Sequence, residues 1–410
     1  MSTKGNCIVG QSGGTTAAIN ASLCGVVQEA MQNKEIGKIY GAINGIEGVL
    51  KEKFIDLGVL ADKVDFLPAL KNTPASYLGS CRFKLPKIAE NRAIFEEIFK
   101  IFFAYQIKYF FYIGGNDSMD TVAKISAYAK EIGYPISIIG VPKTIDNDLL
   151  GTDHTPGYGS AAKYIATTVR EIGIDCDVYD LNSVTIVEIM GRNAGWLTAA
   201  SALARAEGLL APHLIYLPET PFNDEQFIKD IKTLQNRGIR NVVVAVSEGV
   251  RYADGTYVCE NASSGMTDAF GHKCLSGTAK VLENRVRSLL GCKARGVEVN
   301  VIQRCAGHLT SLTDISESEQ IGIQAVKEAI AGSTGKIMVF KRLCDKPYQV
   351  TIESKDIEGI ANGEKIIPTE WIAKEGNDVT QAFVDYAMPL IMGETTPQFK
   401  DGVPVYLKRS

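Results

Sequence analysis

Short apolar runs alternate with helical stretches along most of this chain, and this alternation restricts its fold more than any other feature. The apolar runs, which we predict to be strands, cover residues 4–10, 107–115, 134–141, 184–191, 241–249 and 297–304. The predicted helices lie within residues 11–31, 118–131, 192–207 and 317–332. Strands that are apolar throughout are typical of parallel sheets covered by helices on both faces. The sequence therefore predicts an α/β fold with doubly wound sheets.

Size and charge exclude several classes of protein. A chain of 410 residues is long enough for two or more domains. Lysine and arginine number 43 against 47 for aspartate and glutamate, and this net charge of −4 argues against nucleic-acid binding through a broad basic surface. The most apolar stretch, 195–217, contains Arg205 and Glu207, so we expect neither a membrane span nor a membrane partner.

The cysteines and histidines indicate a reduced protein without a zinc site. The nine cysteines are scattered without a C-x-x-C pair, and only four histidines are present. A tetrahedral zinc site usually takes clustered cysteine and histidine ligands. The first residues also lack the apolar segment of a secretory signal. Buried, reduced thiols in a cytoplasmic protein are the expectation.

Two glycine-rich clusters follow predicted strands, at the edge where open α/β sheets place ligands. Gly13 and Gly14 would let backbone N–H groups approach an anion, although a tight turn without function is an equally good interpretation. In the second cluster, GGNDS at 114–118, Asp117 or Ser118 belongs either to a ligand site or to the N-cap of the next helix. A carboxylate at such a turn repels phosphate unless a cation lies between them.

A third cluster, within 141–159, contains the residue types that phosphoryl transfer to a hydroxyl requires. Lys143, Thr144, Asp146 and Asp148 lie within six residues, directly after a predicted strand. The reaction needs a base at the hydroxyl, a cation at the transferred group and magnesium. Asp146 and Asp148 face the same way if the backbone is extended. The alternative is a solvated turn in which an aspartate only caps the chain.

Four arginines fit an anionic substrate, since arginine binds phosphate through two parallel hydrogen bonds. Arg192 follows a predicted strand, Arg295 and Arg304 flank another, and Arg82 follows a Gly-Ser-Cys turn. A single surface arginine is usually only solvated, so none of them alone indicates a site.

Taken in order, the motifs GGNDS, PKTIDNDL, MGRNAGW and VNVIQR resemble the phosphofructokinase family over about residues 6–341. The later GNDV and FVDYAMPLI resemble its pyrophosphate-dependent branch. The resemblance implies two doubly wound, Rossmann-like α/β/α domains with the active site in the cleft between them, and a homodimer or homotetramer. It implies a phosphoryl-donor domain at 1–152, rejoined by about 306–345, and a sugar-phosphate domain at 153–305. Residues 346–410 would form a cap or an interface element.

The resemblance also implies a role for each motif residue. The reaction would be a magnesium-dependent phosphoryl transfer to the C1 hydroxyl of fructose 6-phosphate. Asp146 would accept the proton, with Lys143, Thr144, Asp148 and Arg192 around it. The sugar phosphate would contact Met190, Gly191, Arg192, Glu248, Arg304 and, from a neighbouring subunit, Arg295. The donor site would include Gly13, Gly14, Arg82, Asp117 and Ser118, and Asn116 would meet the magnesium ion.

Two positions predict the phosphoryl donor. ATP-using members of the family carry GGDGS and PGTIDND. This chain has Asp117 in place of the last glycine of the first motif and Lys143 in place of the glycine of the second. A carboxylate beside an α-phosphate disfavours ATP, and a fixed ammonium stabilises charge on the phosphoryl group of pyrophosphate. We therefore predict pyrophosphate as the donor. An ATP-dependent 6-phosphofructokinase and a non-catalytic regulatory subunit are the alternatives, and the absence of GxGxxG disfavours a dinucleotide-binding oxidoreductase.

Several positions depart from the pattern of the family. Asn116 replaces the aspartate that usually meets magnesium, and a neutral amide is the weaker ligand. Ser183, Val301, Cys305 and Ala306 also differ, so a sugar phosphate other than fructose 6-phosphate stays open as the substrate. Cys24 and Gln28 stand where bacterial ATP-dependent members carry effector-binding arginines, so we expect no nucleotide or phosphoenolpyruvate control through that site.

Overall fold

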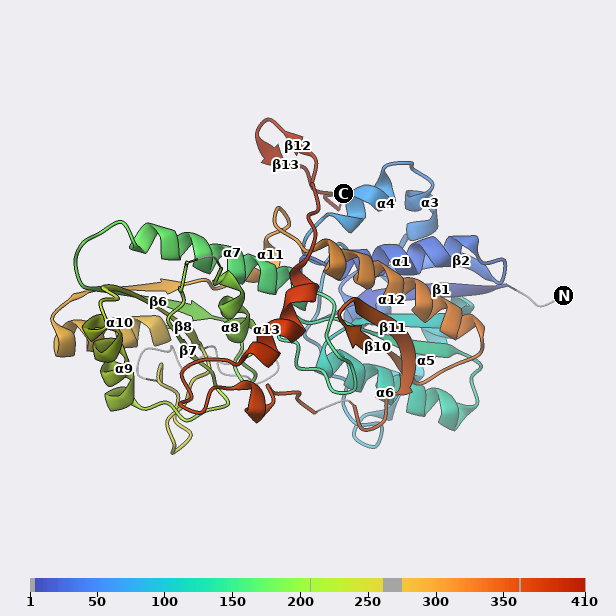
Figure 1. Ribbon diagram of the computed structural model, residues 1–410. Helices are drawn as coiled ribbons and strands as arrows, with labels where there is room; N and C mark the ends of the chain where they lie inside the picture. The colour runs from blue at the N-terminus through green and yellow to red at the C-terminus, as the bar shows by residue number, and fades with distance from the viewer. Residues whose placement is uncertain (1–3, 207, 261–274, 361–362, 410) are drawn as a thin grey trace.

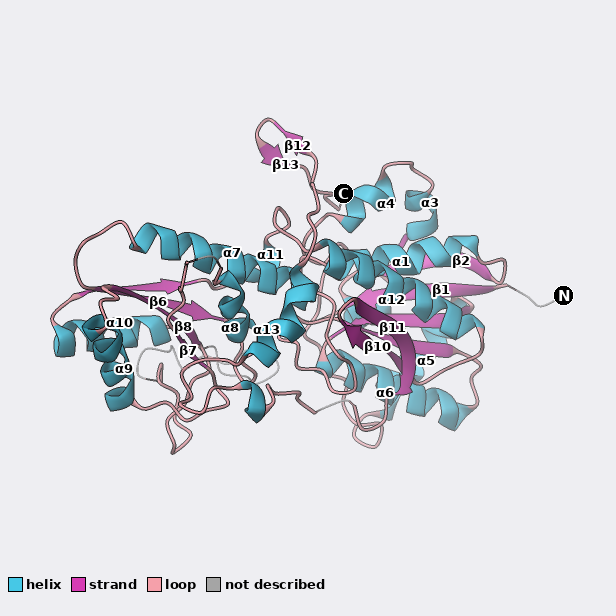
Figure 2. Cartoon of the chain, viewed as in Figure 1, coloured by secondary structure: helices cyan, strands magenta, loops and turns pink. Residues whose placement is uncertain are grey.

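The computed structural model describes residues 4–206, 208–260, 275–360 and 363–409, which form two α/β domains side by side (Figures 1 and 2). The larger sheet has seven strands in the order β11-β10-β5-β4-β1-β2-β3. Their bounds are Gly5–Gln11 (β1), Ile36–Ala42 (β2), Phe54–Asp56 (β3), Ile107–Gly114 (β4), Ser137–Pro142 (β5), Lys336–Asp345 (β10) and Tyr348–Asp356 (β11). The five inner strands pair in parallel, and β3 and β11 are antiparallel at the two edges.

Helices cover both faces of this sheet, as its apolar strands require. On one face lie α1 (Ile19–Gln32) and α12 (Leu312–Ile330), and on the other lie α5 (Arg92–Ala104) and α6 (Asn116–Ile132). Three short helices follow β2 and β3: Gly45–Leu50 (α2), Leu57–Ala61 (α3) and Phe66–Lys71 (α4). The chain leaves this domain after β5 and returns to it with α12 and β10, so the first sheet is assembled from both halves of the sequence.

The second sheet is smaller and entirely parallel, in the order β7-β8-β6-β9. Its strands are Ser183–Ile189 (β6), Leu214–Tyr216 (β7), Asn241–Ser247 (β8) and Lys293–Glu298 (β9). One face is covered by α7 (Tyr158–Cys176), α8 (Trp196–Ala200) and the 3-10 helix η1 (Ser201–Ala204), and the other by α9 (Asp224–Asn236) and α10 (Thr278–Leu290).

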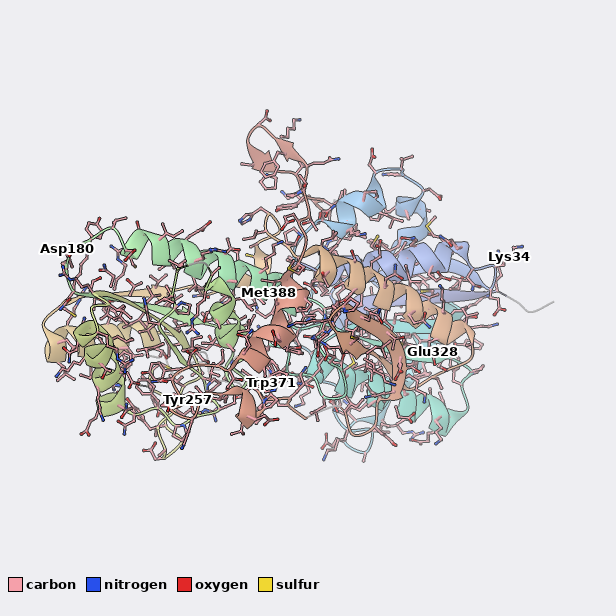
Figure 3. All side chains as sticks on the ribbon, viewed as in Figure 1. Lys34, Asp180, Tyr257, Glu328, Trp371 and Met388 are labelled. Carbon is pink, nitrogen blue, oxygen red and sulfur yellow. The ribbon has the colours of Figure 1, made fainter. Side chains whose placement is uncertain are left out.

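The C-terminal residues contact both domains. They contain the 3-10 helices Thr369–Trp371 (η2) and Met388–Ile391 (η3), the helix Gln381–Ala387 (α13), and a hairpin of Phe399–Lys400 (β12) and Val403–Pro404 (β13). Figure 3 places the labelled Trp371 and Met388 near the middle of the molecule, where α13 runs between the two domains. Trp371 and Tyr386 pack on Trp196 of α8, while the Tyr386 hydroxyl reaches the residues that follow β5.

One predicted strand is wrong in position. The apolar run 297–304 was expected to form a strand, but β9 ends at Glu298 and Ile302–Cys305 forms a short helix (α11). Asn300 has a φ of 48°, a left-handed conformation that ends the strand. The apolar side chains of Val301 and Ile302 are 47% and 53% exposed, so their hydrophobicity does not mark a buried strand here. None of the described helices is long and apolar enough to cross a membrane.

Candidate active site

Strands from both sheets end at a shared cavity of about 580 Å³. The strands β1, β4 and β5 of the first sheet, and β6 and β8 of the second, lead directly into residues that line it. The predicted site residues on its wall are Gly13, Gly14, Arg82, Asn116, Asp117, Ser118, Lys143, Thr144, Asp146, Asp148, Met190, Arg192, Glu248 and Arg304. The carboxyl edges of the two sheets therefore carry a common ligand-sized cavity between the domains.

Lys143 brings a buried cation to this cavity, with only 2% of the residue exposed. Its ammonium group donates hydrogen bonds to the carbonyl oxygens of Ser12, at 2.9 Å, and of Gly14. Burial lowers the pKa of Lys143 to about 7, and the negative charge of Asp146 opposes this change. A polyanion in the cavity would favour the protonated lysine. Lys143 is thus suited to stabilise negative charge on a bound phosphoryl group.

Asp146 and Asp148 both line the cavity, although the backbone between them is not extended. Asn147, the residue between them, has a φ of 57°, so the chain turns there. Burial raises the pKa of Asp146, against the opposing charges of Arg192 and Lys143. The pKa of Asp148 is raised to about 7, mainly by burial and in addition by the charge of Asp146. A carboxylate with a raised pKa is a better proton acceptor at neutral pH.

Neither aspartate caps a helix, and neither do the polar residues of the GGNDS motif. The next helix after the aspartates, α7, has Gly157 as its N-cap. Helix α6 has Gly115 as its N-cap without a side-chain hydrogen bond, so Asp117 and Ser118 are not its caps. The Asp117 carboxylate lies 3.9 Å from the Lys84 ammonium group, a cation that reduces the repulsion of an approaching phosphate.

Asn116 links the GGNDS motif to the aspartate pair. Its Nδ2 donates a hydrogen bond to Asp148 Oδ2 over 3.3 Å. Its Oδ1 is buried and accepts no hydrogen bond from any described residue. A buried oxygen without a partner costs free energy, and a bound cation would satisfy it.

The glycine-rich turn after β1 brings backbone close to two cations. Gly13 has a φ of 77°, which is strained for other residues. A Cβ atom added to Gly13 would lie 3.4 Å from Lys143 Nζ, and one added to Gly14 would lie 3.4 Å from Arg304 Nη1. The Gly13 N–H is not free for a ligand, because it donates to the Cys81 carbonyl oxygen over 3.2 Å. The turn therefore gives space and nearby positive charge to an anion.

The second domain contributes Met190, Arg192 and Glu248 to the cavity wall, but not Gly191. Gly191 has a φ of 128°, and its N–H donates to Glu248 Oε1 over 3.4 Å. Its carbonyl oxygen accepts a 2.6 Å hydrogen bond from the Ser247 hydroxyl. Burial raises the pKa of Glu248 to about 7, and Asp146 adds to this effect. Gly191 thus fixes the turn between Met190 and Arg192 and orients Glu248.

Among the predicted site side chains that the structure describes, Arg295 is the one that does not line the cavity. It is exposed on the edge strand β9 and lines a separate cavity of about 280 Å³ with residues of α7 such as Glu171, Asp175 and Cys176. Within one copy of the chain, Arg295 therefore does not meet the other predicted substrate residues.

Seven residues that the sequence reasoning missed also line the cavity: Thr15, Lys84, Gly115, Ile145, Asn193, Ala194 and Glu364. Most of them belong to the motifs already quoted or directly follow one, so those motifs mark more of the site than was predicted. Glu364 is different, because it comes from the C-terminal segment and no local pattern marks it. Its Oε1 accepts a 2.7 Å hydrogen bond from Asn193 Nδ2, which joins this segment to the second domain.

Comparisons with known proteins agree with this geometry. A sequence model described as phosphofructokinase matches residues 6–329. A Halomonas elongata protein named pyrophosphate–fructose 6-phosphate 1-phosphotransferase is 42% identical over 407 residues, which is 98% of this chain and 96% of that relative. A Methylococcus capsulatus protein of the same name is 40% identical over 98% of this chain and 95% of its own length. The crystal structure of a pyrophosphate-dependent phosphofructokinase from Marinobacter aquaeolei matches with a TM-score of 0.86 and 40% identity, covering 98% of this chain and 95% of that one. The chain therefore belongs to the phosphofructokinase family.

Proposed function

We propose that this enzyme transfers a phosphoryl group from pyrophosphate to the C1 hydroxyl of fructose 6-phosphate. The products are fructose 1,6-bisphosphate and phosphate, and the reaction is reversible. The observation that carries this proposal is the presence of Asp117 and Lys143 in one cavity with Asp146. Lys84 reduces the repulsion between Asp117 and pyrophosphate, whereas an α-phosphate in the space that the Asp117 carboxylate occupies is disfavoured. The buried ammonium of Lys143 stabilises the transferred group. The names of the Halomonas and Methylococcus relatives support the same donor and acceptor.

Asp146 is the base in this proposal and accepts the proton of the C1 hydroxyl as the oxygen attacks phosphorus. Its own backbone N–H donates to Thr144 Oγ1 over 3.1 Å, which fixes the turn that presents the carboxylate. Arg192 and Lys143 are cations close enough to lower the pKa of Asp146 against the effect of burial. Their positive charges favour the ionised carboxylate, which is the form that can take a proton.

The two substrates occupy opposite walls of the cavity. Pyrophosphate lies against the first domain, where the proposed contacts are Gly13, Gly14, Arg82, Asp117 and Ser118. Fructose 6-phosphate lies against the second domain, where they are Met190, Arg192, Glu248 and Arg304, and it also meets Asp148 from the loop after β5 of the first domain. Arg295 of a neighbouring subunit completes the 6-phosphate site in this proposal, because Arg295 lies outside the cavity of its own chain.

We propose that Asn116 and Asp148 hold magnesium together with oxygens of pyrophosphate. Within the described residues, no three acidic, histidine or cysteine side chains converge on a metal site. Magnesium commonly takes only one or two protein ligands and completes its shell with phosphate and water oxygens. The unpartnered Oδ1 of Asn116 lies in a residue that contacts Asp148, so these two residues would supply that small number of protein ligands. When bound, the ion neutralises negative charge on the phosphate oxygens.

We also propose a homodimer or homotetramer that works in the cytoplasm. The oligomer rests on the position of Arg295 described above. The location rests on the cysteines, because all eight that the structure describes are free thiols, as a reducing compartment allows. The ninth, Cys274, lies outside the described residues.

The donor assignment is tested by assays with fructose 6-phosphate and magnesium, with pyrophosphate or ATP supplied in parallel. The wild-type protein is expected to turn over with pyrophosphate alone. Exchanging Asp117→Gly together with Lys143→Gly is expected to lower pyrophosphate turnover by at least about 100-fold, since the exchange removes the charge that stabilises the transferred group.

The matched control is Asp401→Gly with Lys400→Gly, an exposed pair of the same charges on the C-terminal hairpin. That double variant is expected to keep wild-type turnover. Wild-type turnover with ATP, or pyrophosphate turnover that survives the exchange of Asp117 and Lys143, would contradict the donor assignment.

A further inference from the structure

The C-terminal segment runs directly beside the loop that carries the two aspartates. Glu364 forms an antiparallel β-bridge with Leu149, and the Lys365 N–H donates to the Asp148 carbonyl oxygen over 2.7 Å. On its other side, the Lys365 carbonyl oxygen accepts a 2.8 Å hydrogen bond from Trp196 Nε1 of α8. This stretch therefore connects the aspartate loop of the first domain to a helix of the second.

The side chain of Lys365 extends under the same loop. Its ammonium group donates to the carbonyl oxygen of Asp153 at 2.6 Å, to that of Thr152 at 3.3 Å and to Asn147 Oδ1 at 3.3 Å. The three N–H groups of the ammonium thus all have acceptors in the loop. Burial lowers the pKa of Lys365 to about 8, which shows that its charge is costly at this position.

The hydrogen bonds of Lys365 act on the two aspartates through Asn147. It lies between Asp146 and Asp148, is fully buried and has the left-handed φ of 57°. Its Nδ2 donates to the Tyr386 hydroxyl over 2.9 Å, and that hydroxyl donates to the Asp153 carbonyl oxygen over 2.8 Å. Both polar atoms of the Asn147 amide are therefore held by residues of the C-terminal segment.

The side chains of Asn147, Lys365 and Tyr386 do not line the cavity, so any effect that they have on the reaction passes through the loop. A left-handed residue between two aspartates sets the direction of both carboxylates. The conformation costs about 1 kcal/mol or more for a residue with a side chain, so it persists only where neighbouring groups fix it. Lys365 and Tyr386 are the groups that fix it here.

We propose that Lys365 is a positioning residue for the reaction, which holds Asp146 and Asp148 in their catalytic directions through the amide of Asn147. Tyr386 supports the same amide from its other side. The inference rests on the proposed role of Asp146 and adds Lys365, a residue that lies outside the motifs quoted above. It gives the C-terminal segment a role in the active site beyond covering it.

The test is Lys365→Met, which keeps most of the apolar length of the side chain and removes the ammonium group with its hydrogen bonds to the loop. The value of kcat with pyrophosphate is expected to fall about 10- to 100-fold, because misplaced catalytic groups cost that much. The Kd for fructose 6-phosphate, measured by calorimetry, is expected to stay within about threefold, because its contacts with Met190, Arg192, Glu248 and Arg304 are intact. The matched control is Lys355→Met, which removes a 2.7 Å hydrogen bond to the Gly151 carbonyl oxygen of the same loop but does not reach Asn147. Its kcat is expected to equal that of the wild type.

A second variant keeps the test decisive if Lys365→Met folds poorly. Tyr386→Phe removes one hydroxyl group and is expected to lower kcat about 3- to 10-fold while the aromatic ring still packs. Wild-type kcat in either folded variant, or a parallel loss of kcat and sugar-phosphate binding, would overturn the inference. An Asp146→Asn protein is assayed alongside: if it is active, the proposed base is wrong, whereas if it is inactive and Lys365→Met is unaffected, only the positioning role fails.

Discussion

At the scale of single residues, burial sets the charges that the cavity offers to its substrates. Lys143, Asp148 and Glu248 have pKa values of about 7, each because the side chain is removed from water. A group with its pKa near neutrality changes charge when a ligand brings a new charge nearby. The protonation state of this cavity therefore depends on whether an anionic substrate is bound.

The lowered pKa of Lys143 predicts that pyrophosphate binding weakens as the pH rises. The ammonium form binds the anion, and with a pKa of about 7 its population in the free enzyme falls above neutral pH. The KM for pyrophosphate is therefore expected to rise by up to about tenfold per pH unit above pH 7. Steady-state assays between about pH 6 and pH 9 measure this slope.

Lys143→Arg is the comparison, because a guanidinium stays protonated throughout that range. Pyrophosphate itself titrates in both assays, so the informative quantity is the ratio of the two KM values at each pH. A ratio that does not change with pH would show that Lys143 remains charged in the free enzyme.

At the scale of elements, close contact between α1 and α12 joins distant parts of the first domain. Glycines make this contact possible, since a Cβ atom added to Gly25 would lie 2.0 Å from the Glu319 carbonyl oxygen. One added to Gly322 would lie 2.2 Å from the Ser22 carbonyl oxygen. The backbones of the two helices therefore touch, and α12 holds the returning chain against α1.

Gly25→Ala is expected to destabilise the protein, although helix propensity alone predicts a gain of about 1 kcal/mol. The added methyl group forces the helices apart, at a cost of about 1–3 kcal/mol. The net cost of up to about 2 kcal/mol is expected to lower the midpoint of thermal unfolding, followed by circular dichroism, by up to about 3 °C. Met31→Ala on the same helix is the control, because Met31 is 41% exposed and its replacement leaves the contact intact. A midpoint for Gly25→Ala at or above the wild-type value would mean that the two helices separate at little cost.

At the scale of the whole molecule, one chain brings together nearly all of the predicted site, and Arg295 is the side chain that it leaves out. Arg295 lies on the edge strand of the second sheet, beside a cavity of its own. The remaining side chains converge because the chain crosses from the first sheet to the second and back. The C-terminal segment then contributes Glu364 to the wall of the cavity.

If Arg295 serves the site of a neighbouring subunit, two inactive variants are expected to restore activity when they are mixed. Arg295→Ala weakens the 6-phosphate site of the partner, and Asp146→Asn disables the site of its own chain. After subunit exchange, random pairing places one intact site in each hybrid dimer, so about one quarter of the wild-type activity is expected. The activity of the mixture is compared with the sum of the separately assayed variants. A mixture that shows no more than that sum, although subunit exchange is demonstrated, would contradict this assignment.

Much of the fold and of the site was predictable because its signals are local. Apolar runs predicted β1, β4, β5, β6 and β8 near their observed positions, and the polar clusters at their ends predicted most of the cavity wall. One local pattern gave a wrong position. The run 297–304 is apolar but partly exposed, and the observed strand β9 begins earlier in the sequence, where it pairs with β6. The shared direction of Asp146 and Asp148 was expected from an extended backbone, whereas a turn at Asn147 separates them.

The sequence by itself determined the α/β alternation, the family and the set of charged side chains at the strand ends. These follow from the period of apolar residues and from residue types at fixed spacing, which neighbouring residues alone can specify. Only the tertiary structure decided that Lys143 and Asp148 have pKa values of about 7, that Arg295 lies outside the cavity, and that Lys365 holds the aspartate loop. Burial and contacts between distant segments depend on how the whole chain packs, and no local pattern carries that information.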